Sequence, residues 1–384
     1  MLLAIGREKA HAILRMPGSI IISCPEAAVN GSVDDSLPGI ECGFQMQSPI
    51  GTSTFRNRLL VWYDANARDL PWRKSGDPYR VWVSEIMLQQ TRVAAVIEHY
   101  HEFLRRFPTV EKLAAAREAS VLAAWSGLGY YRRARMLHGA AKVIARERGG
   151  KFPHTAEEWR ELPGIGRYTS AAIASIAFGQ TVAVVDGNVE RVLQRFAGER
   201  VSGEELWQAA ESLLDRKRPG DFNQAMMELG ATVCTPRAPA CLTCPVVELC
   251  ATRGQMATGE KAAKPAKREI HYALHVRHGE VFLVQRPHDA RLLAGMWELP
   301  EIPRPPDDAW PEFTVRHSIT VTDYTVTVWR TSVPSHIKAT WISVKKISRV
   351  ALTGLTRKIL RRAGLLTMNQ RSDRSVGSRV IDAR

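Results

Sequence analysis

The feature that most constrains this chain is a set of four cysteines at the spacing Cys-x6-Cys-x2-Cys-x5-Cys, formed by Cys234, Cys241, Cys244 and Cys250. The set directly follows a helix-like stretch, 223–233. Four thiolates on one short segment can surround a metal centre, because soft sulfur ligands suit iron–sulfur clusters and zinc. Structural zinc more often uses paired Cys-x2-Cys arms, and only one such arm occurs here. The spacing favours one 4Fe-4S cluster, with zinc or two disulfides as the alternatives.

Length and hydropathy indicate a soluble protein of more than one domain. The 384 residues are enough for two domains with tails, and 45% of them are hydrophobic. No apolar run approaches the roughly 20 residues that a membrane-spanning helix needs. Charged residues from Arg7 on interrupt the start of the chain too early for the apolar core of a signal peptide. We therefore expect a cytoplasmic protein that does not bind a membrane.

The net charge of +14 indicates a polyanionic partner, and nucleic acid is the first candidate because phosphate contacts release counterions. Part of the charge lies in a tail: residues 357–384 hold eight Arg and Lys against two Asp, which gives +6. Solvated basic tails are common, so charge alone does not establish the partner.

The pattern of apolar residues divides the chain into five segments. They are a poorly ordered extension (1–54), a helical domain (55–250), a linker (251–268), a second domain (269–365) and a basic tail (366–384). In the helical domain apolar residues recur three and four positions apart, whereas beyond the linker they alternate, which is typical of half-buried strands.

Local signals predict individual elements. Helices begin at Asp77-Pro78 and run through Gln90, at Pro108-Thr109, and at Thr155 with a capping box. Strands span 270–276 and 319–328, and a last helix spans 344–362.

A turn with two glycines lies between helical segments in the run LPGIGRYT (162–169). Gly164 and Gly166 let the backbone turn tightly and leave amide groups free at the start of the next helix, where they can bind a phosphate oxygen. A plain structural turn between helices is the alternative reading.

Two acidic residues stand in contrasting surroundings. Glu85 has Val81, Trp82 and Leu88 as helical neighbours, so burial should raise its pKa unless it lies on a solvated face. Asp186 follows an apolar run and precedes a helix start, where it is either a plain N-cap or a carboxylate kept charged by the helix dipole. One protonated and one charged carboxyl is the division of labour that glycosidic cleavage uses.

The run GLGYYRR (127–133) places two tyrosines beside two arginines. Such aromatic residues usually belong to a core. The alternative is a wedge inserted between DNA bases, with the arginines on phosphates.

Together these motifs resemble the adenine DNA glycosylases of the MutY type, within the helix-hairpin-helix base-excision superfamily. The resemblance spans about residues 55–365. It rests on PWR (71–73), SEIMLQQT (84–91), GLGYY (127–131), LPGIG (162–166), VDGNV (185–189) and NQAMM (223–227), which occur in this order before the cysteines. It implies an all-α glycosylase domain with an iron–sulfur loop, in which 76–182 form a helical barrel part and 55–75 with 183–250 a cluster part. An α+β MutT-like (Nudix-like) domain would follow.

The resemblance implies removal of adenine mispaired with 8-oxoguanine in duplex DNA, by a monomer. Glu85 would protonate adenine N7, Asp186 would stabilise the oxocarbenium-like sugar, and Asn188 would orient the reacting groups. Trp72, Arg73 and Gln224 match positions that line the adenine pocket, and Gln90 and Tyr130 match positions that enter the duplex. Gln89, Gly164, Gly166 and Thr320 complete the predicted DNA-contacting set.

One position separates close relatives. The endonuclease III type carries a lysine after the hairpin that attacks the sugar as an amine and permits strand cleavage. Here Tyr168 stands at that position, and a phenol cannot form the imine. The sequence therefore predicts a monofunctional glycosylase. A bifunctional glycosylase with lyase activity and a non-catalytic DNA-damage-binding protein are the alternatives, although docking alone would need neither acid.

The second domain resembles the MutT-like domain of the same family, most clearly at LAGMWELP (293–300). The acid-rich Nudix helix does not occur in the sequence, so metal-dependent nucleotide hydrolysis is not expected. Where relatives often carry Phe-Ser-His against the lesion, this chain has Ile319, Thr320 and Val321. The hydroxyl is kept and both rings are lost, which leaves the discrimination of 8-oxoguanine from guanine open.

Overall fold

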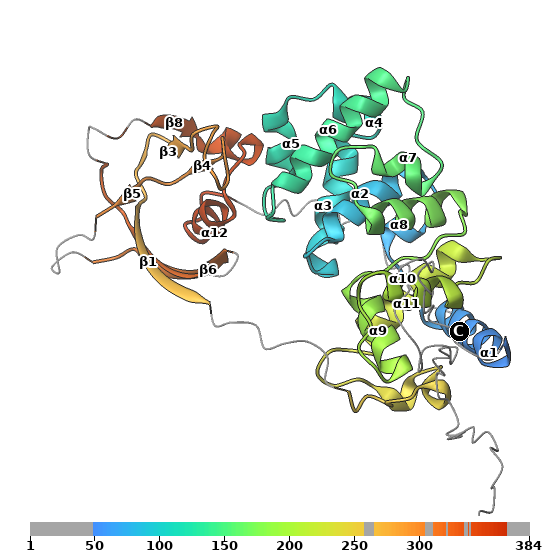
Figure 1. Cartoon of the computed structure of the whole chain (residues 1–384). Coiled ribbons are helices and arrows are strands. Elements are labelled where there is room, and N and C mark those ends of the chain that lie inside the picture. The colour runs from blue at the N-terminus through green and yellow to red at the C-terminus, as the bar shows by residue number, and fades with distance from the viewer. Residues whose placement is uncertain are drawn as a thin grey trace, which may run out of the picture. The chain divides into compact units, whose positions relative to one another are not determined.

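The computed structural model describes residues 49–256, 265–303, 310–319, 322–333, 337 and 339–366 (Figure 1). They form two compact units. The cysteine-bearing unit takes residues up to Trp82, Pro153–Glu161 and Ile165–Glu260, and the sheet-bearing unit takes Val83–Phe152, Leu162–Gly164 and the residues from Lys261 on. Within the described ranges, no helix combines the length and apolar character needed to cross a bilayer.

The cysteine-bearing unit is built from helices. Its elements are α1 (Pro49–Asn66), η1 (Pro71–Arg73), α7 (Ala156–Arg160), α8 (Arg167–Phe178), α9 (Gly187–Ala197), α10 (Gly203–Leu213), α11 (Pro219–Thr232), η2 (Cys241–Thr243) and η3 (Val247–Leu249). Their apolar faces share one core, in which Phe55 of α1 packs edge-on against Phe196 and lies 6.3 Å from the ring of Phe222. This core joins the segment before the cysteines to the N-terminal helix.

The sheet-bearing unit has helices that precede its strands. The helices are α2 (Pro78–Leu88), which begins in the other unit, α3 (Val93–Arg106), α4 (Val110–Ala114), α5 (Glu118–Trp125) and α6 (Arg132–Glu147). Trp125 and Phe103 are fully buried and pack edge to face at 5.9 Å, which fixes α5 against α3.

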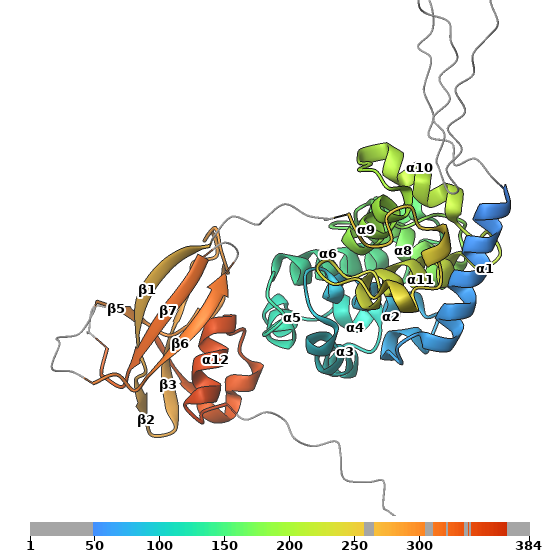
Figure 2. The ribbon, with the colours of Figure 1, turned by 90° about the horizontal axis from the view of Figure 1, so that it is seen from below.

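Two small sheets and a helix form the C-terminal part of this unit (Figure 2). The strands are β1 (Ala266–Ala273), β2 (Val276–Arg277), β3 (Glu280–Gln285), β4 (Trp297–Glu298), β5 (Glu301–Ile302), β6 (Phe313–Ile319), β7 (Thr322–Trp329) and β8 (Thr340–Ser343). One sheet has the order β5-β1-β7-β6, with β1 parallel to β7, and the other has β3 between β2 and β4, with β8 also paired to β3. Helix α12 (Gly354–Arg362) contributes Leu355, Ile359 and Leu360 to the core that the sheets share.

The predicted helix starts are confirmed. The Asp77 carboxylate accepts from the Arg80 amide at 2.8 Å, and the Thr109 side chain caps α4. Thr155 and Glu158 form the predicted capping box at the start of α7. These caps need only neighbours three residues away, which is why the sequence reveals them.

Several predicted boundaries are wrong. Helix α1 begins at Pro49, inside the segment predicted to be an extension, with a proline at its first position. Helix α2 ends at Leu88 rather than at Gln90, which has a left-handed φ of 54°. Strand β1 begins at Ala266, inside the predicted linker. Its first four side chains are exposed, so main-chain pairing with β7, and not an alternating pattern, sets where it begins.

The strand predicted over 319–328 and the helix predicted over 344–362 are each divided. Strand β6 ends at Ile319 and β7 begins at Thr322, and the intervening Thr320 and Val321 lie outside the described residues. The helix is replaced by η4 (Val344–Arg349) and α12, because Leu352 forms a parallel bridge with Trp297 between them. A long-range strand contact thus overrides local helical propensity.

Candidate active site and cysteine loop

Asp186 caps α9 and is held by three donors. Its Oδ1 accepts from the amides of Asn188 at 2.9 Å and Val189 at 2.8 Å, and its Oδ2 accepts from the Asn188 side chain at 2.9 Å. These donors and the positive end of the helix dipole stabilise a negative charge on the half-buried carboxylate. The N-cap interpretation of this residue is confirmed, and its role as a charged catalytic group stays a prediction.

The same network continues from Asn188 to the first cysteine. Asn188 Oδ1 accepts from Arg191 Nη2 at 2.8 Å, and Arg191 Nε donates to the Cys234 carbonyl at 2.8 Å. Burial is the largest influence on Arg191 and lowers its pKa. Gly230 of α11 lets α9 approach, because a Cβ there would lie 2.6 Å from the Asn188 Cβ. Neither Arg191 nor Gly230 belongs to a recognisable motif, so reasoning from the sequence missed both residues.

Asn223 positions the run that leads to Asp186. Its Oδ1 accepts from the Val184 amide at 3.2 Å, and its Nδ2 donates to the Val182 carbonyl at 2.8 Å and to Ser175 Oγ at 2.9 Å. The side chain is 2% exposed. A buried amide with these partners helps to fix a backbone segment that belongs to no helix or strand.

Glu85 lies on α2 and is 6% exposed, so the predicted burial is confirmed. Its helical neighbours Val81 and Trp82 are also buried. Glu85 belongs to the sheet-bearing unit and Asp186 to the cysteine-bearing unit. That the Glu85 and Asp186 carboxyl groups act on the same glycosidic bond is therefore a proposal.

The residues predicted to line a base pocket differ in their surroundings. Trp72 is buried in η1, and Gln224 is half-buried on α11. Arg73 Nη2 donates to Glu228 Oε2 at 2.9 Å, and Arg68 donates to both oxygens of the same carboxylate at 2.6 and 2.7 Å. The Arg73 guanidinium is thus engaged in an ion network that the sequence did not reveal.

The turn at 162–169 uses its two glycines differently. Gly164 has a φ of 77°, and a Cβ there would lie 2.4 Å from the Met136 Cβ. Gly166 caps α8 in an extended conformation with open space around it. Tyr168, in the first turn of α8, donates its hydroxyl to Met227 Sδ at 3.2 Å. The position thus presents a phenol instead of an amine.

The paired tyrosines have different roles. Tyr131 is 4% exposed and belongs to the core, where burial raises the pKa of its hydroxyl. Tyr130 is 49% exposed, and its φ is 47°. Arg132 is exposed, but the Arg133 guanidinium binds backbone carbonyls, so the alternative in which both arginines lie on phosphates does not fit Arg133.

The four cysteines are free, half-buried thiols. Burial is the largest influence on the Cys244 thiol and raises its pKa to about 11; a backbone hydrogen bond at Val246 acts in the opposite direction, and the other three cysteines raise the pKa further. Within the part of the chain that the structure describes, no three or more His, Cys, Asp or Glu side chains are grouped so that they could hold a single metal ion. A multi-iron cluster is larger than one ion, and its ligands stand further apart, so the four thiols fit a cluster by their chemistry.

Arg195 anchors the loop on which the cysteines lie. It is 2% exposed, and it donates to the carbonyls of Thr235 at 2.7 Å and Pro236 at 3.0 Å. Its Nη1 also lies 3.4 Å from Cys234 Sγ. These contacts hold the backbone that follows the first cysteine in one conformation.

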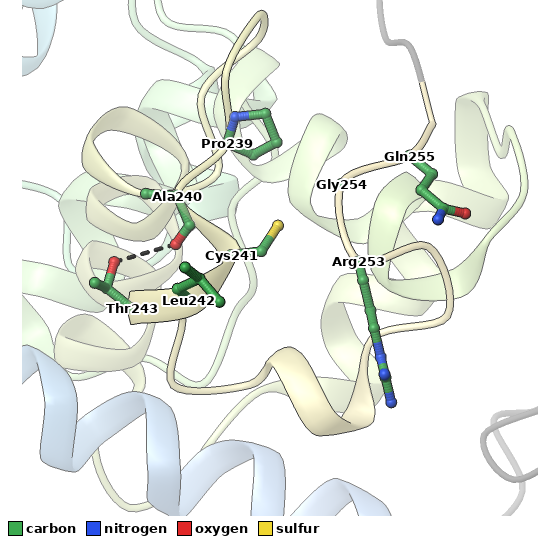
Figure 3. A pocket seen from close by; sticks show the side chains of 8 residues that line it. All are labelled: Pro239, Ala240, Cys241, Leu242, Thr243, Arg253, Gly254 and Gln255. Carbon is green, nitrogen blue, oxygen red and sulfur yellow. Dashed lines mark hydrogen bonds between the residues drawn. The ribbon is translucent and has the colours of Figure 1, made fainter.

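A hollow lies between the segments 239–243 and 253–255 (Figure 3). It is lined by Pro239, Ala240, Cys241, Leu242, Thr243, Arg253, Gly254 and Gln255. A Cβ on Gly254 would lie 2.8 Å from Cys241 Sγ, so a glycine with its φ of 84° lets the two segments close around the thiol.

Comparison with known proteins places this geometry in a family. Residues 83–215 match the family described as HhH-GPD superfamily base excision DNA repair protein. The adenine DNA glycosylase of Mus musculus is 40% identical over 319 residues, covering 67% of this chain and 62% of that protein. The adenine DNA glycosylase of Homo sapiens is 40% identical over 321 residues, covering 67% and 59%. The chain thus spans about three fifths of the length of these curated relatives.

Solved structures support the fold of the helical part. A thermostable thymine-DNA glycosylase is 30% identical with a TM-score of 0.51, and the match covers 54% of this chain and 98% of that one. The predicted helical glycosylase fold, followed by a region with sheets, is confirmed at this level. Residues 83–215 therefore form a domain of the HhH-GPD superfamily of base excision DNA repair proteins, and the curated homologues of the chain are named adenine DNA glycosylase.

Proposed function

We propose that this chain is a DNA glycosylase that removes adenine mispaired with 8-oxoguanine by hydrolysing the N-glycosidic bond. The observation that carries the proposal is the Asp186 carboxylate, whose charge is stabilised by three N–H donors at the start of α9. Buried Glu85 supplies the second acid. The name of the curated relatives supports adenine as the base.

The two acids would have different roles in the reaction: one would donate a proton and the other would stabilise positive charge. Adenine is extruded from the duplex, at a cost of a few kcal/mol of unstacking. Glu85 then gives its proton to adenine N7, which makes the base a better leaving group. As the glycosidic bond breaks, positive charge develops on the sugar, and Asp186 stabilises it directly or through a transient covalent bond before water attacks. Asn188 keeps Asp186 oriented through its side-chain amide.

The proposal predicts base loss without strand cleavage. A duplex with adenine opposite 8-oxoguanine, mixed with excess protein, should release adenine, and strand breaks should appear only after alkali treatment. The reason is that Tyr168 offers a phenol and no amine for imine formation. Duplexes with adenine opposite guanine and opposite thymine serve as controls. Strand breaks at the rate of base loss would instead support the bifunctional alternative, and binding without release would support a non-catalytic protein.

We further infer that Cys234, Cys241, Cys244 and Cys250 hold one 4Fe-4S cluster. Bound there, it would supply four iron–thiolate bonds that fix the loop in one conformation. We expect purified protein to contain about four iron and four sulfide per chain with broad visible absorbance. Stoichiometric zinc without iron would contradict the assignment.

Loss of Arg191 should disconnect Asp186 from the cysteine loop. Arg191→Leu removes the bonds to Asn188 Oδ1 and the Cys234 carbonyl, so we expect adenine release to slow by about 100-fold, because a small misplacement of a reacting group is costly. Single-turnover rates and iron content, measured together, test this. The matched control is Arg167→Leu, whose guanidinium pairs with Glu204 on the surface. Equal rates in both variants would argue against the network.

For the C-terminal region we propose the lesion-recognition role of a MutT-like domain, in a monomeric cytoplasmic protein. Its support is the α+β architecture, with α12 packed on the shared core of the two sheets. Thr320, predicted to contact the lesion, lies outside the described residues. The ratio of release rates from duplexes containing 8-oxoguanine or guanine measures this role, and a ratio near one would contradict it.

A further inference from the structure

Arg133, at the start of α6, binds the C-terminal end of α2. Its Nη1 donates to the carbonyls of Ile86 at 2.8 Å and Met87 at 2.9 Å, and also to that of Gln89. The last carbonyls of a helix have no partner within the helix, and a cation is favourable at this end of the helix dipole. Arg133 therefore supplies hydrogen-bond donors to the backbone carbonyls at the C-terminal end of α2.

The other arm of the same guanidinium binds a second segment. Arg133 Nη2 donates to Thr91 Oγ1 at 3.0 Å and to the carbonyls of Leu128 at 3.2 Å and Gly129 at 3.3 Å. The planar fork of arginine can reach both segments at once, whereas lysine offers a single charged point. None of these described partners is a carboxylate, and burial lowers the pKa of Arg133 to about 10. The residue therefore serves backbone geometry and not an ion pair.

Each of the two segments carries a residue with a left-handed φ that, by the family resemblance, is expected to contact the duplex. Gln90 has a φ of 54° and Tyr130 a φ of 47°, in the left-handed region that residues other than glycine rarely adopt. The Arg133 guanidinium also lies 5.5 Å from the centre of the Tyr130 ring. Such conformations persist when neighbouring contacts hold them, and Arg133 supplies contacts to both.

We propose that Arg133 is a positioning residue that clamps the two turns together, so that Gln90 and Tyr130 meet the duplex as one rigid unit. The inference rests on the proposed function, because that function brings Gln90 and Tyr130 to DNA. The contacts that the structure describes for the Arg133 guanidinium are all with protein groups. Its loss releases both turns at the same time, although they lie about forty residues apart in the sequence.

The first arm of the test needs no DNA. Hydrogen exchange is compared between the wild type, Arg133→Met, Arg133→Lys and the exposed neighbour control Arg132→Met. Amides of 89–92 and 127–131 should exchange about tenfold faster in both Arg133 variants, while α8 and the Arg132→Met control stay unchanged. If circular dichroism shows that Arg133→Met is unfolded, Arg133→Lys is compared with the wild type instead. Faster exchange in only one segment, in neither, or in Arg133→Met alone would overturn the clamp.

The second arm uses a duplex with 2-aminopurine in place of adenine, whose fluorescence rises when the base leaves the stack. Arg133→Met should bind this duplex within threefold of the wild-type Kd and lose most of the fluorescence rise. From the matching duplex with adenine opposite 8-oxoguanine it should release adenine about 100-fold more slowly. A wild type that neither unstacks nor releases the base would refute the proposed function. An active wild type with equal fluorescence and rates in Arg133→Met would refute the clamp alone.

Discussion

Replacing Asp186 by asparagine should slow adenine release by about 10³-fold or more, because a neutral amide cannot stabilise the charge that develops on the sugar. Asparagine is as good an N-cap as aspartate, so α9 should keep its start and the protein its stability. Single-turnover release from a duplex with adenine opposite 8-oxoguanine measures the effect. Unfolding temperature measures the integrity of the fold.

Glu85→Gln should reduce the same rate by about 10²- to 10⁴-fold, the range for loss of a general acid. Glutamine fills the same buried volume but cannot give a proton to adenine N7. Duplex affinity should remain near that of the wild type, since neither change removes a positive charge. The double variant should lose less than the product of the two single losses, because the acids act in one step.

The matched control for these two variants is Glu118→Gln, a surface carboxylate paired with Arg135. It should release adenine at the wild-type rate. If Glu85→Gln and Asp186→Asn also kept that rate, the assigned roles would be wrong, and the glycosylase proposal would need other acids.

Replacing Glu228 by glutamine should lower the free energy of unfolding by about 3 kcal/mol. Its carboxylate is 1% exposed and neutralises Arg68 and Arg73, so the change leaves two guanidinium groups near the core without their anion. We place the effect at the lower end of the range for buried pairs because the Arg68 side chain is 39% exposed. Denaturant unfolding of both proteins at neutral pH gives the difference.

The stabilisation that Glu228 provides with Arg68 and Arg73 should depend on pH. Burial raises the pKa of Glu228, but hydrogen bonds from Arg68 and Arg73 outweigh it and lower the pKa below its ordinary value of 4.5. A lowered pKa in the folded state means that the stabilisation is complete above pH 4.5 and is lost as the pH falls through the folded pKa. The difference between wild type and Glu228→Gln should therefore stay constant from neutral pH to about 4.5 and then shrink.

A surface pair provides the control for Glu228. Lys74 and Asp69 lie 3.0 Å apart with exposed side chains, so Asp69→Asn should change the unfolding free energy by less than about 1 kcal/mol. A loss as small as this for Glu228→Gln, or a difference that grows as the pH falls, would contradict the argument for the buried network.

Local chemistry explains most of what could be predicted from the sequence. The caps at Asp77, Thr109, Thr155 and Asp186 depend on hydrogen bonds to residues two or three positions ahead, so they are visible in the linear order of residues. Burial of Glu85 follows from apolar neighbours on its own helix. The boundaries at Ala266 and Leu352 could not be predicted, because pairing with β7 and a bridge to Trp297 determine them.

By itself the sequence determined the helical and strand-rich parts, the acid at each of two motif positions and the four thiols of one loop. Only the tertiary structure showed which groups hold them. Arg191 reaches Cys234 and Arg133 reaches Gln89 across more than forty residues, and Glu228 meets Arg68 across 160. A long side chain with several donors can form hydrogen bonds with many possible acceptors. Which acceptors it binds is decided only when the chain packs and brings particular acceptors within reach.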